Sequence, residues 1–130
     1  MNDTRWLTRE IVIVLHRELI AEHGGASGLR DGGALESALA RPQQKHHYES
    51  GDICALAATY AFGLCSNHPF VDGNKRVALT SLDVFLRING WALTATEVDA
   101  VATIVELASG QLSEEDLAKW VRKNAVRQGE

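Results

Sequence analysis

Apolar residues recur every three or four positions along most of the chain, the spacing of helices that bury one face. This pattern predicts helices at residues 8–23, 35–40, 52–67, 74–89, 94–110 and from 113 onward. Thr8 is a candidate N-cap of the first helix, and Gly24 begins a glycine-rich loop that ends it. The second helix is expected to stop near Pro42, because the residue before a proline resists helical geometry. We therefore expect an all-α fold.

Two of these helices have the character of a buried pair. Residues 52–67 are rich in alanine, and residues 74–89 follow them after a short loop. Together they are expected to form the centre of a compact bundle of about six helices. Thr94 and Glu97 have the spacing of a capping box for the next helix. The last helix, opened by Ser113, is expected to fray into a polar tail at its end.

The composition narrows the class of protein. A chain of 130 residues with 45% hydrophobic side chains is typical of one soluble domain, here residues 1–130. The formal net charge of −4 argues against direct binding to nucleic acid, because such proteins usually carry a basic excess. The longest nearly apolar run, residues 55–65, is about half of what a membrane span needs.

The two cysteines suggest a reducing environment. Cys54 and Cys65 lie on one predicted helix, and at about 1.5 Å rise per residue they are roughly 16 Å apart. That distance is too long for a disulfide. The N-terminal residues are polar and lack the pattern of a signal peptide. The sequence therefore predicts a cytoplasmic protein that does not enter a membrane.

Residues 68–76, which read HPFVDGNKR, concentrate the chemistry of the chain in the loop between the two central helices. Backbone N–H groups at a helix N-terminus attract phosphates. The residues expected to form such a phosphate cradle here are Gly73, Asn74, Lys75 and Arg76. Asp72 offers a hard oxygen ligand suited to Mg²⁺, and His68 can take a proton from an attacking hydroxyl. The set predicts phosphoryl or nucleotidyl transfer.

Each of these residues, taken alone, also has a structural interpretation. His68 alone would more often be a loop or capping residue, and Asp72 alone would more often cap the next helix. Lys75 and Arg76 alone would form a solvated face. The joint pattern is what favours an active site. Phe70, by contrast, is expected to point into the core and anchor the loop.

Other histidines and cations allow further interpretations. A metal site built from His46, His47 and His68 is disfavoured, because adjacent residues point in different directions in a helix or strand. No Cys or carboxylate has the spacing of a zinc site. Arg41, Lys45 and His46 could contact a nucleotide or an acceptor protein, or could lie in a solvated loop. The sequence leaves that choice open.

The loop resembles the signature of the Fic/Doc superfamily, His-Pro-Phe-x-(Asp/Glu)-Gly-Asn-x-Arg. All seven defined positions match: His68, Pro69, Phe70, Asp72, Gly73, Asn74 and Arg76. Residues 28–42, 57–60 and 85–90 resemble the Doc branch, so the resemblance covers roughly residues 7–125. It implies a Fic-like helical bundle. It also implies that His68 is the base, Asp72 the Mg²⁺ ligand and residues 73–76 the phosphate cradle.

Lys75 indicates the branch of the superfamily. Typical Fic enzymes have glycine at this position and transfer AMP to a protein hydroxyl, whereas the Doc branch has lysine. The resemblance then implies a reversed ATP whose γ-phosphate faces the acceptor. Doc-like proteins are kinases whose known target is a threonine of elongation factor Tu, and phosphorylation of this threonine halts translation. The alternatives are an AMP transferase and a catalytically silent module that binds an antitoxin.

The same resemblance implies a protein partner. Doc toxins are encoded with a Phd-like antitoxin whose C-terminal segment covers the active site. Self-restrained Fic proteins instead carry a Ser/Thr-x-x-x-Glu inhibitory helix, and the nearest segment here, residues 109–114, has the wrong spacing. An external inhibitor is therefore expected, docked on apolar residues of the first helix and the segment before the loop.

Overall fold

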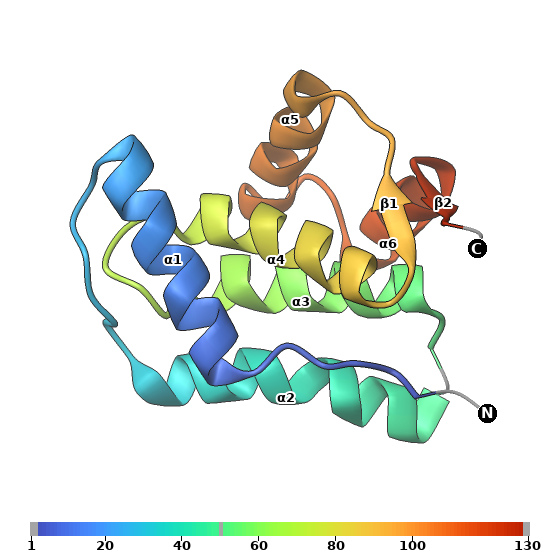
Figure 1. The fold of residues 1–130 in the computed structure, drawn as a ribbon, viewed down its shortest axis with the longest axis horizontal. Coiled ribbons are helices and arrows are strands. Elements are labelled where there is room, and N and C mark those ends of the chain that lie inside the picture. The colour runs from blue at the N-terminus through green and yellow to red at the C-terminus, as the bar shows by residue number, and fades with distance from the viewer. Residues whose placement is uncertain (1–2, 50, 129–130) are drawn as a thin grey trace.

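Helix α3 (Ile53–Asn67) runs through the centre of the fold, with other helices packed around it (Figure 1). The structure is a computed structural model that describes residues 3–49 and 51–128. Its other elements are, in chain order, α1 (Arg9–His23), α2 (Gly32–Glu49), α4 (Asn74–Ile88), β1 (Trp91–Leu93), α5 (Glu97–Ala108), α6 (Glu114–Lys123) and β2 (Ala125–Arg127). The described residues form a mostly helical domain of six helices and one small hairpin, which confirms the predicted bundle.

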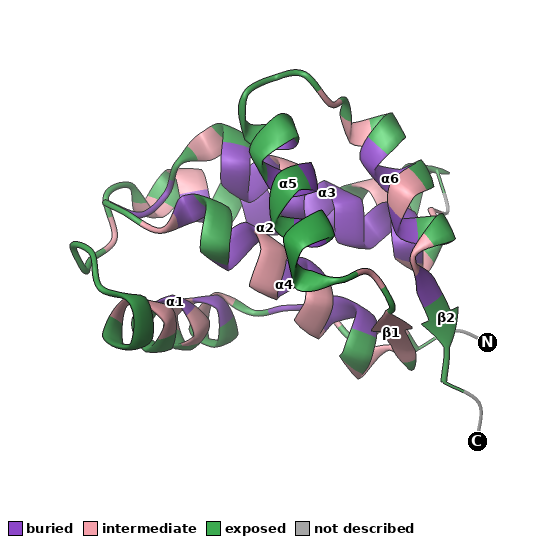
Figure 2. Ribbon diagram, turned by 90° about the horizontal axis from the view of Figure 1, so that it is seen from above, coloured by how far each residue is buried: buried purple, intermediate pink, exposed green. Residues whose placement is uncertain are grey.

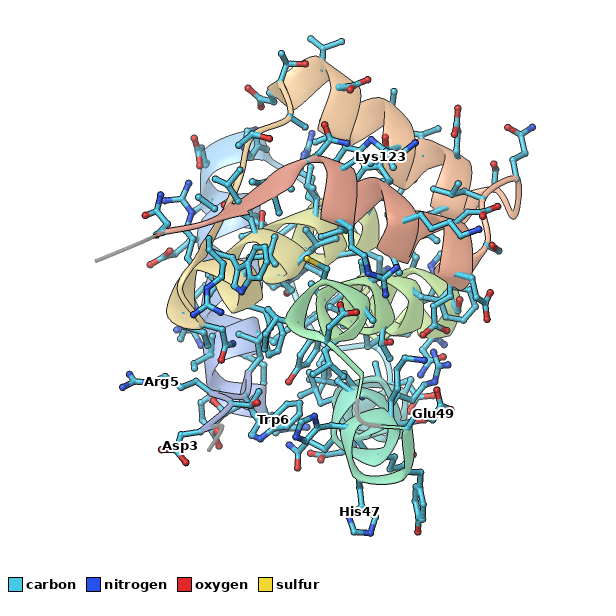
Figure 3. The ribbon with its side chains drawn as sticks, turned by 90° about the vertical axis from the view of Figure 1, so that its right-hand side faces the viewer. Asp3, Arg5, Trp6, His47, Glu49 and Lys123 are labelled. Atoms are coloured by element: carbon cyan, nitrogen blue, oxygen red, sulfur yellow. The ribbon has the colours of Figure 1, made fainter. Side chains whose placement is uncertain are left out.

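The predicted central pair is confirmed as well. Helix α3 is buried along most of its length (Figure 2), and Leu56, Tyr60 and Leu64 are fully enclosed. Figure 3 shows α3 between α2 on one side and α6 on the other, with α4 packed along it. The small side chains of α3 allow these neighbours to approach closely, so the loop between α3 and α4 is carried by the buried centre of the fold.

The prediction that the second helix ends near Pro42 is wrong, because α2 continues through this proline to Glu49. Proline lacks an N–H, so the carbonyl of Ala38 loses its helical partner. That carbonyl lies against Gly63 of α3. A Cβ added to Gly63 would be 3.2 Å from the Cβ of Ala38 and 3.5 Å from the carbonyl oxygen of Ala38. Close packing of α2 on α3 buries Leu39 and Pro42 and outweighs one lost hydrogen bond.

Helix α1 begins and ends as predicted, and the Thr8 side chain accepts a hydrogen bond from the Ile11 N–H. The burial of its apolar side chains is uneven. Val12 and His16 are buried, whereas Ile11 and Val14 are 37% and 42% exposed. The reason is that α1 crosses the edge of the bundle and packs mainly on α4, so only a narrow strip of the helix is covered.

Two predictions for the C-terminal half are corrected. Thr96, not Thr94, caps α5 by accepting a hydrogen bond from the Asp99 N–H. The Thr94 N–H donates to the Asn124 carbonyl instead. Part of the predicted polar tail is a strand, since β2 pairs antiparallel with β1. Residues 129–130 of that tail lie outside the described part of the chain.

None of the described helices is both long and apolar enough to cross a lipid bilayer. Cys54 and Cys65 are both buried and unbridged.

Asp52 joins the start of α3 to α6, and its removal is expected to destabilise the fold. Its side chain accepts a 2.8 Å hydrogen bond from the Ala55 N–H and a 2.9 Å bond from Nη2 of Arg122. Burial alone would raise the pKa of Asp52, but these two partners lower it below its ordinary value. We expect Asp52→Ala to lower the free energy of unfolding by about 0.5–2 kcal/mol at neutral pH, as for other N-caps.

The pH dependence of that loss follows from the lowered pKa. The stabilisation by Asp52 is complete above the ordinary aspartate pKa of about 3.9 and is lost as the pH falls through the lower pKa of the folded state. Urea unfolding at several pH values should therefore show the wild type and Asp52→Ala converging in acid. Asp52→Asn, which keeps a capping oxygen, is the control. A constant difference between wild type and Asp52→Ala would contradict the assignment.

Candidate active site

The loop between α3 and α4, residues 68–73, is held in place by the segment before α2 (Figure 1). Leu29 and Phe70 form an isolated antiparallel bridge. The Arg30 N–H donates to the Pro69 carbonyl at 2.7 Å, and the Val71 N–H donates to the Gly28 carbonyl at 3.0 Å. The glycine-rich segment therefore acts as a short strand beside the loop, a role that its sequence did not indicate.

Phe70 lies in the core, as predicted, with 2% of its surface exposed. Asn74 secures the backbone at this residue. Its Oδ1 accepts from the Phe70 N–H at 3.0 Å, and its Nδ2 donates to the Phe70 carbonyl at 2.9 Å. The Asn74 side chain, which is 8% exposed, is thus committed to shaping the loop. Only its backbone N–H remains available to a phosphate.

His16 of α1 is a supporting residue that the sequence analysis missed. Its ring stacks on Phe70 with centroids 3.8 Å apart and an interplanar angle of 10°. Its Nε2 lies 2.7 Å from the Asp72 carbonyl oxygen and must carry the proton, because a carbonyl can only accept. The available signal was its spacing of four residues from Val12, which places both on one helix face.

A pocket of about 600 Å³ lies between the loop, the first turn of α4 and helix α5. The structure brings all six predicted site residues to its lining: His68, Asp72, Gly73, Asn74, Lys75 and Arg76. The remaining lining residues are apolar: Cys65, Val71, Leu79, Val101, Ile104, Val105 and Ala108. The sequence gave no reason to expect α5 beside the loop, so its part in the pocket was not predicted.

The polar end of the pocket is suited to an anion. Gly73 begins α4 with a left-handed φ of 78°, and the described chain provides no side-chain cap for this helix. The N–H groups of the first turn therefore keep their positive partial charge. Lys75 and Arg76 are exposed there, and neither forms an ion pair with another described residue. Two free cations and a helix N-terminus meet at one place.

Asp72 supplies a carboxylate beside these cations. Its Oδ1 accepts a 2.8 Å hydrogen bond from the Gly73 N–H, and its Oδ2 accepts a 3.3 Å bond from the Ala26 N–H. Each oxygen keeps lone pairs for a further partner. The described residues contain no group of three or more side chains placed to hold a metal. A single carboxylate fits Mg²⁺, which commonly completes its octahedron with phosphate oxygens and water.

His68 ends α3 in the left-handed conformation, with a φ of 48°, and its imidazole is exposed at the pocket. Its Nδ1 is 3.5 Å from Nδ2 of Asn74. This separation is too long to fix the tautomer of the ring. Either nitrogen can therefore accept a proton from a hydroxyl that enters the pocket.

The other histidines and cations considered from the sequence do not line this pocket. His46 packs edge-on against Trp6 with ring centroids 5.5 Å apart. Arg41 pairs with Glu114 at 2.9 Å, and Lys45 pairs with Glu49 at 3.1 Å. These residues belong to the α2 helix and its contacts, so the structure gives them no direct part in the site.

The thiol in the apolar part of the lining is unreactive. Burial raises the pKa of the Cys65 thiol to about 11, although the nearby Lys75 ammonium opposes the shift. The thiol is therefore neutral near pH 7 and is not a nucleophile. Together with Leu79 and Ile104 it offers an apolar surface of the kind that ligand pockets use for aromatic rings.

Comparisons with known proteins identify the family of the chain. The Protein kinase doc of Escherichia phage P1 is 35% identical over 120 residues, which cover 92% of this chain and 94% of that protein. The Toxin Doc of Mycolicibacterium smegmatis is 37% identical over 94 residues, covering 71% of this chain and 70% of that one. Residues 6–86 match the profile of the Fic/DOC family. The chain therefore belongs to the Fic/Doc family.

Proposed function

We propose that this protein is a toxin that phosphorylates a protein hydroxyl with ATP and Mg²⁺, as the name of its phage P1 relative suggests. The observation that carries the proposal is the single pocket shared by an exposed imidazole, a carboxylate, a helix N-terminus and the two cations Lys75 and Arg76. This set of groups supplies what phosphoryl transfer requires: a base, a metal ligand and an anion cradle.

In the proposed reaction each group has one task. His68 takes the proton from the acceptor hydroxyl as that oxygen attacks the γ-phosphorus. The bond from this phosphorus to the β–γ bridging oxygen breaks, and ADP leaves with its electron pair. The N–H groups of the first turn of α4, with Lys75 and Arg76, hold the phosphate oxygens and neutralise their charge. Asp72 would hold Mg²⁺, which supplies charge stabilisation at the transferred phosphoryl group. The apolar wall at Leu79 and Ile104 is suited to the adenine ring.

Lys75 favours a kinase over an AMP transferase. It lies in the first turn of α4 and lines the pocket, where most Fic enzymes have glycine. The bulk of its side chain reduces the space for the diphosphate of an ATP bound in the AMP-transferring orientation. In the reversed orientation implied by the resemblance, the γ-phosphate faces the acceptor.

The proposed target and partner follow from the resemblance to Doc. The target is a threonine of elongation factor Tu, whose modification would arrest translation in the cytoplasm. A Phd-like antitoxin would restrain the toxin by covering the pocket with its C-terminal segment. Ile11 and Val14, which α1 leaves exposed at 37% and 42%, support an apolar docking surface on α1.

Separate labelling of the α- and γ-phosphates of ATP tests the reaction. The purified protein is incubated with Mg²⁺, purified elongation factor Tu and one or the other label. We expect γ-label on elongation factor Tu and no α-label, with the phosphate on a threonine by mass spectrometry. The His68→Ala protein, purified in the same way, controls for contaminating kinases.

The outcomes separate the alternatives. Transfer of α-label would contradict the kinase assignment and indicate an AMP transferase despite Lys75. Absence of both labels, in elongation factor Tu and in a bacterial lysate, would contradict both activities and leave the silent antitoxin-binding module.

A further inference from the structure

His68 has an unusual backbone. It is the one non-glycine residue with a positive φ among the described residues, at 48°. A residue with a Cβ adopts this backbone conformation at an energetic penalty. The conformation therefore persists only where surrounding contacts impose it. The direction of the imidazole depends on this conformation, because His68 leaves α3 at the point where the chain turns into the loop.

The usual closure of such a helix end is incomplete here. A helix that ends in a left-handed residue is normally closed by the backbone N–H groups that follow, which donate to carbonyls of the last turn. The next residue is Pro69, which has no N–H. Pro69 therefore cannot donate the second backbone hydrogen bond that normally helps to fix such a turn.

The Arg30 side chain, from the segment before α2, instead supplies donors to the two carbonyls at the turn itself. Its Nε donates to the His68 carbonyl at 2.7 Å, and its Nη2 donates to the Asn67 carbonyl at 2.9 Å. Its backbone N–H also holds the Pro69 carbonyl at 2.7 Å. The guanidinium thus binds the carbonyls of two consecutive residues at the turn. Its positive charge is also stabilising there, because the C-terminal end of a helix carries a partial negative charge.

We propose that Arg30 is a positioning residue for His68. Through two parallel donors it holds residues 67 and 68 in the conformation that directs the imidazole into the pocket. A lysine cannot replace it, because an ammonium is a point donor and does not reproduce the planar fork. Arg30 does not line the pocket, so its effect reaches the reaction only through His68. The inference rests on the proposed role of His68 as the base.

Steady-state kinetics of Arg30→Lys and Arg30→Gln, with ATP and elongation factor Tu, provide the first test. We expect kcat to fall by about 10–100-fold, the size of effect that a small misplacement of a reacting group produces. The KM for ATP should stay close to wild type, because the cradle at residues 73–76 is untouched. Arg9→Lys is the matched control, since the Arg9 side chain is 38% exposed and pairs with Glu36 at 3.3 Å. It should leave both constants unchanged.

Histidine ring NMR provides a second test that does not depend on transfer. The His68 signals are identified by their loss in His68→Ala. We expect them to shift in both Arg30 variants and to stay in place in Arg9→Lys. Unchanged His68 signals, or an unchanged kcat in both Arg30 variants, would overturn the proposal. If the wild type transfers no label at all, the proposed function fails and the NMR result alone decides the positioning role.

Discussion

Replacement of His68 by alanine is expected to lower the rate of phosphoryl transfer by roughly 10²–10⁴-fold, the usual contribution of a general base. The fold should remain intact, because the His68 imidazole is exposed and its Nδ1 has only a 3.5 Å contact with Asn74. ATP binding should also remain, since the phosphate cradle lies in α4. The variant separates the proton transfer from binding.

The measurement is the rate of γ-phosphate transfer to elongation factor Tu, with ATP affinity from calorimetry and the melting temperature determined on the same preparation. His47→Ala is the matched control. Figure 3 shows that His47 points away from the domain, so the loss of this imidazole should change none of the three quantities. A His68→Ala protein that transfers phosphate at the wild-type rate would remove His68 from the mechanism.

Replacement of Phe70 by alanine is expected to destabilise the protein by about 3–5 kcal/mol, as for other buried aromatic residues. The ring is 2% exposed and stacks on His16 at 3.8 Å. Since His16 also holds the Asp72 carbonyl, the loop should loosen around the site. We expect the melting temperature to fall by roughly 10–20 °C. Transfer should be impaired even where the variant is still folded.

Thermal and urea unfolding measure this effect. Val71→Ala is the control, because the neighbouring side chain is 54% exposed and its truncation should change the free energy of unfolding by about 0.5 kcal/mol or less. An unfolding curve of Phe70→Ala that matches the wild type would mean that the ring contributes nothing to the core.

Local signals in the sequence predicted the helices well. Thr8 and Ser113 cap α1 and α6 as expected, because an N-cap hydrogen bond joins residues only three positions apart. The errors occurred where distant contacts outweigh a local preference. Pro42 stays inside α2 because α2 packs on α3, and β2 forms because β1 lies beside it. Neither partner can be identified from the residues near Pro42 or near the C-terminus.

The candidate site divides in the same way. The sequence by itself determined the chemistry of the loop, because His68, Asp72 and residues 73–76 lie within one short segment at the start of a helix. Only the tertiary structure decided what holds and surrounds that segment. Arg30 lies 38 positions from His68, His16 lies 56 from Asp72, and the wall of α5 comes from further along the chain. Packing of the bundle brings these groups together, and their positions depend on all the helices between them.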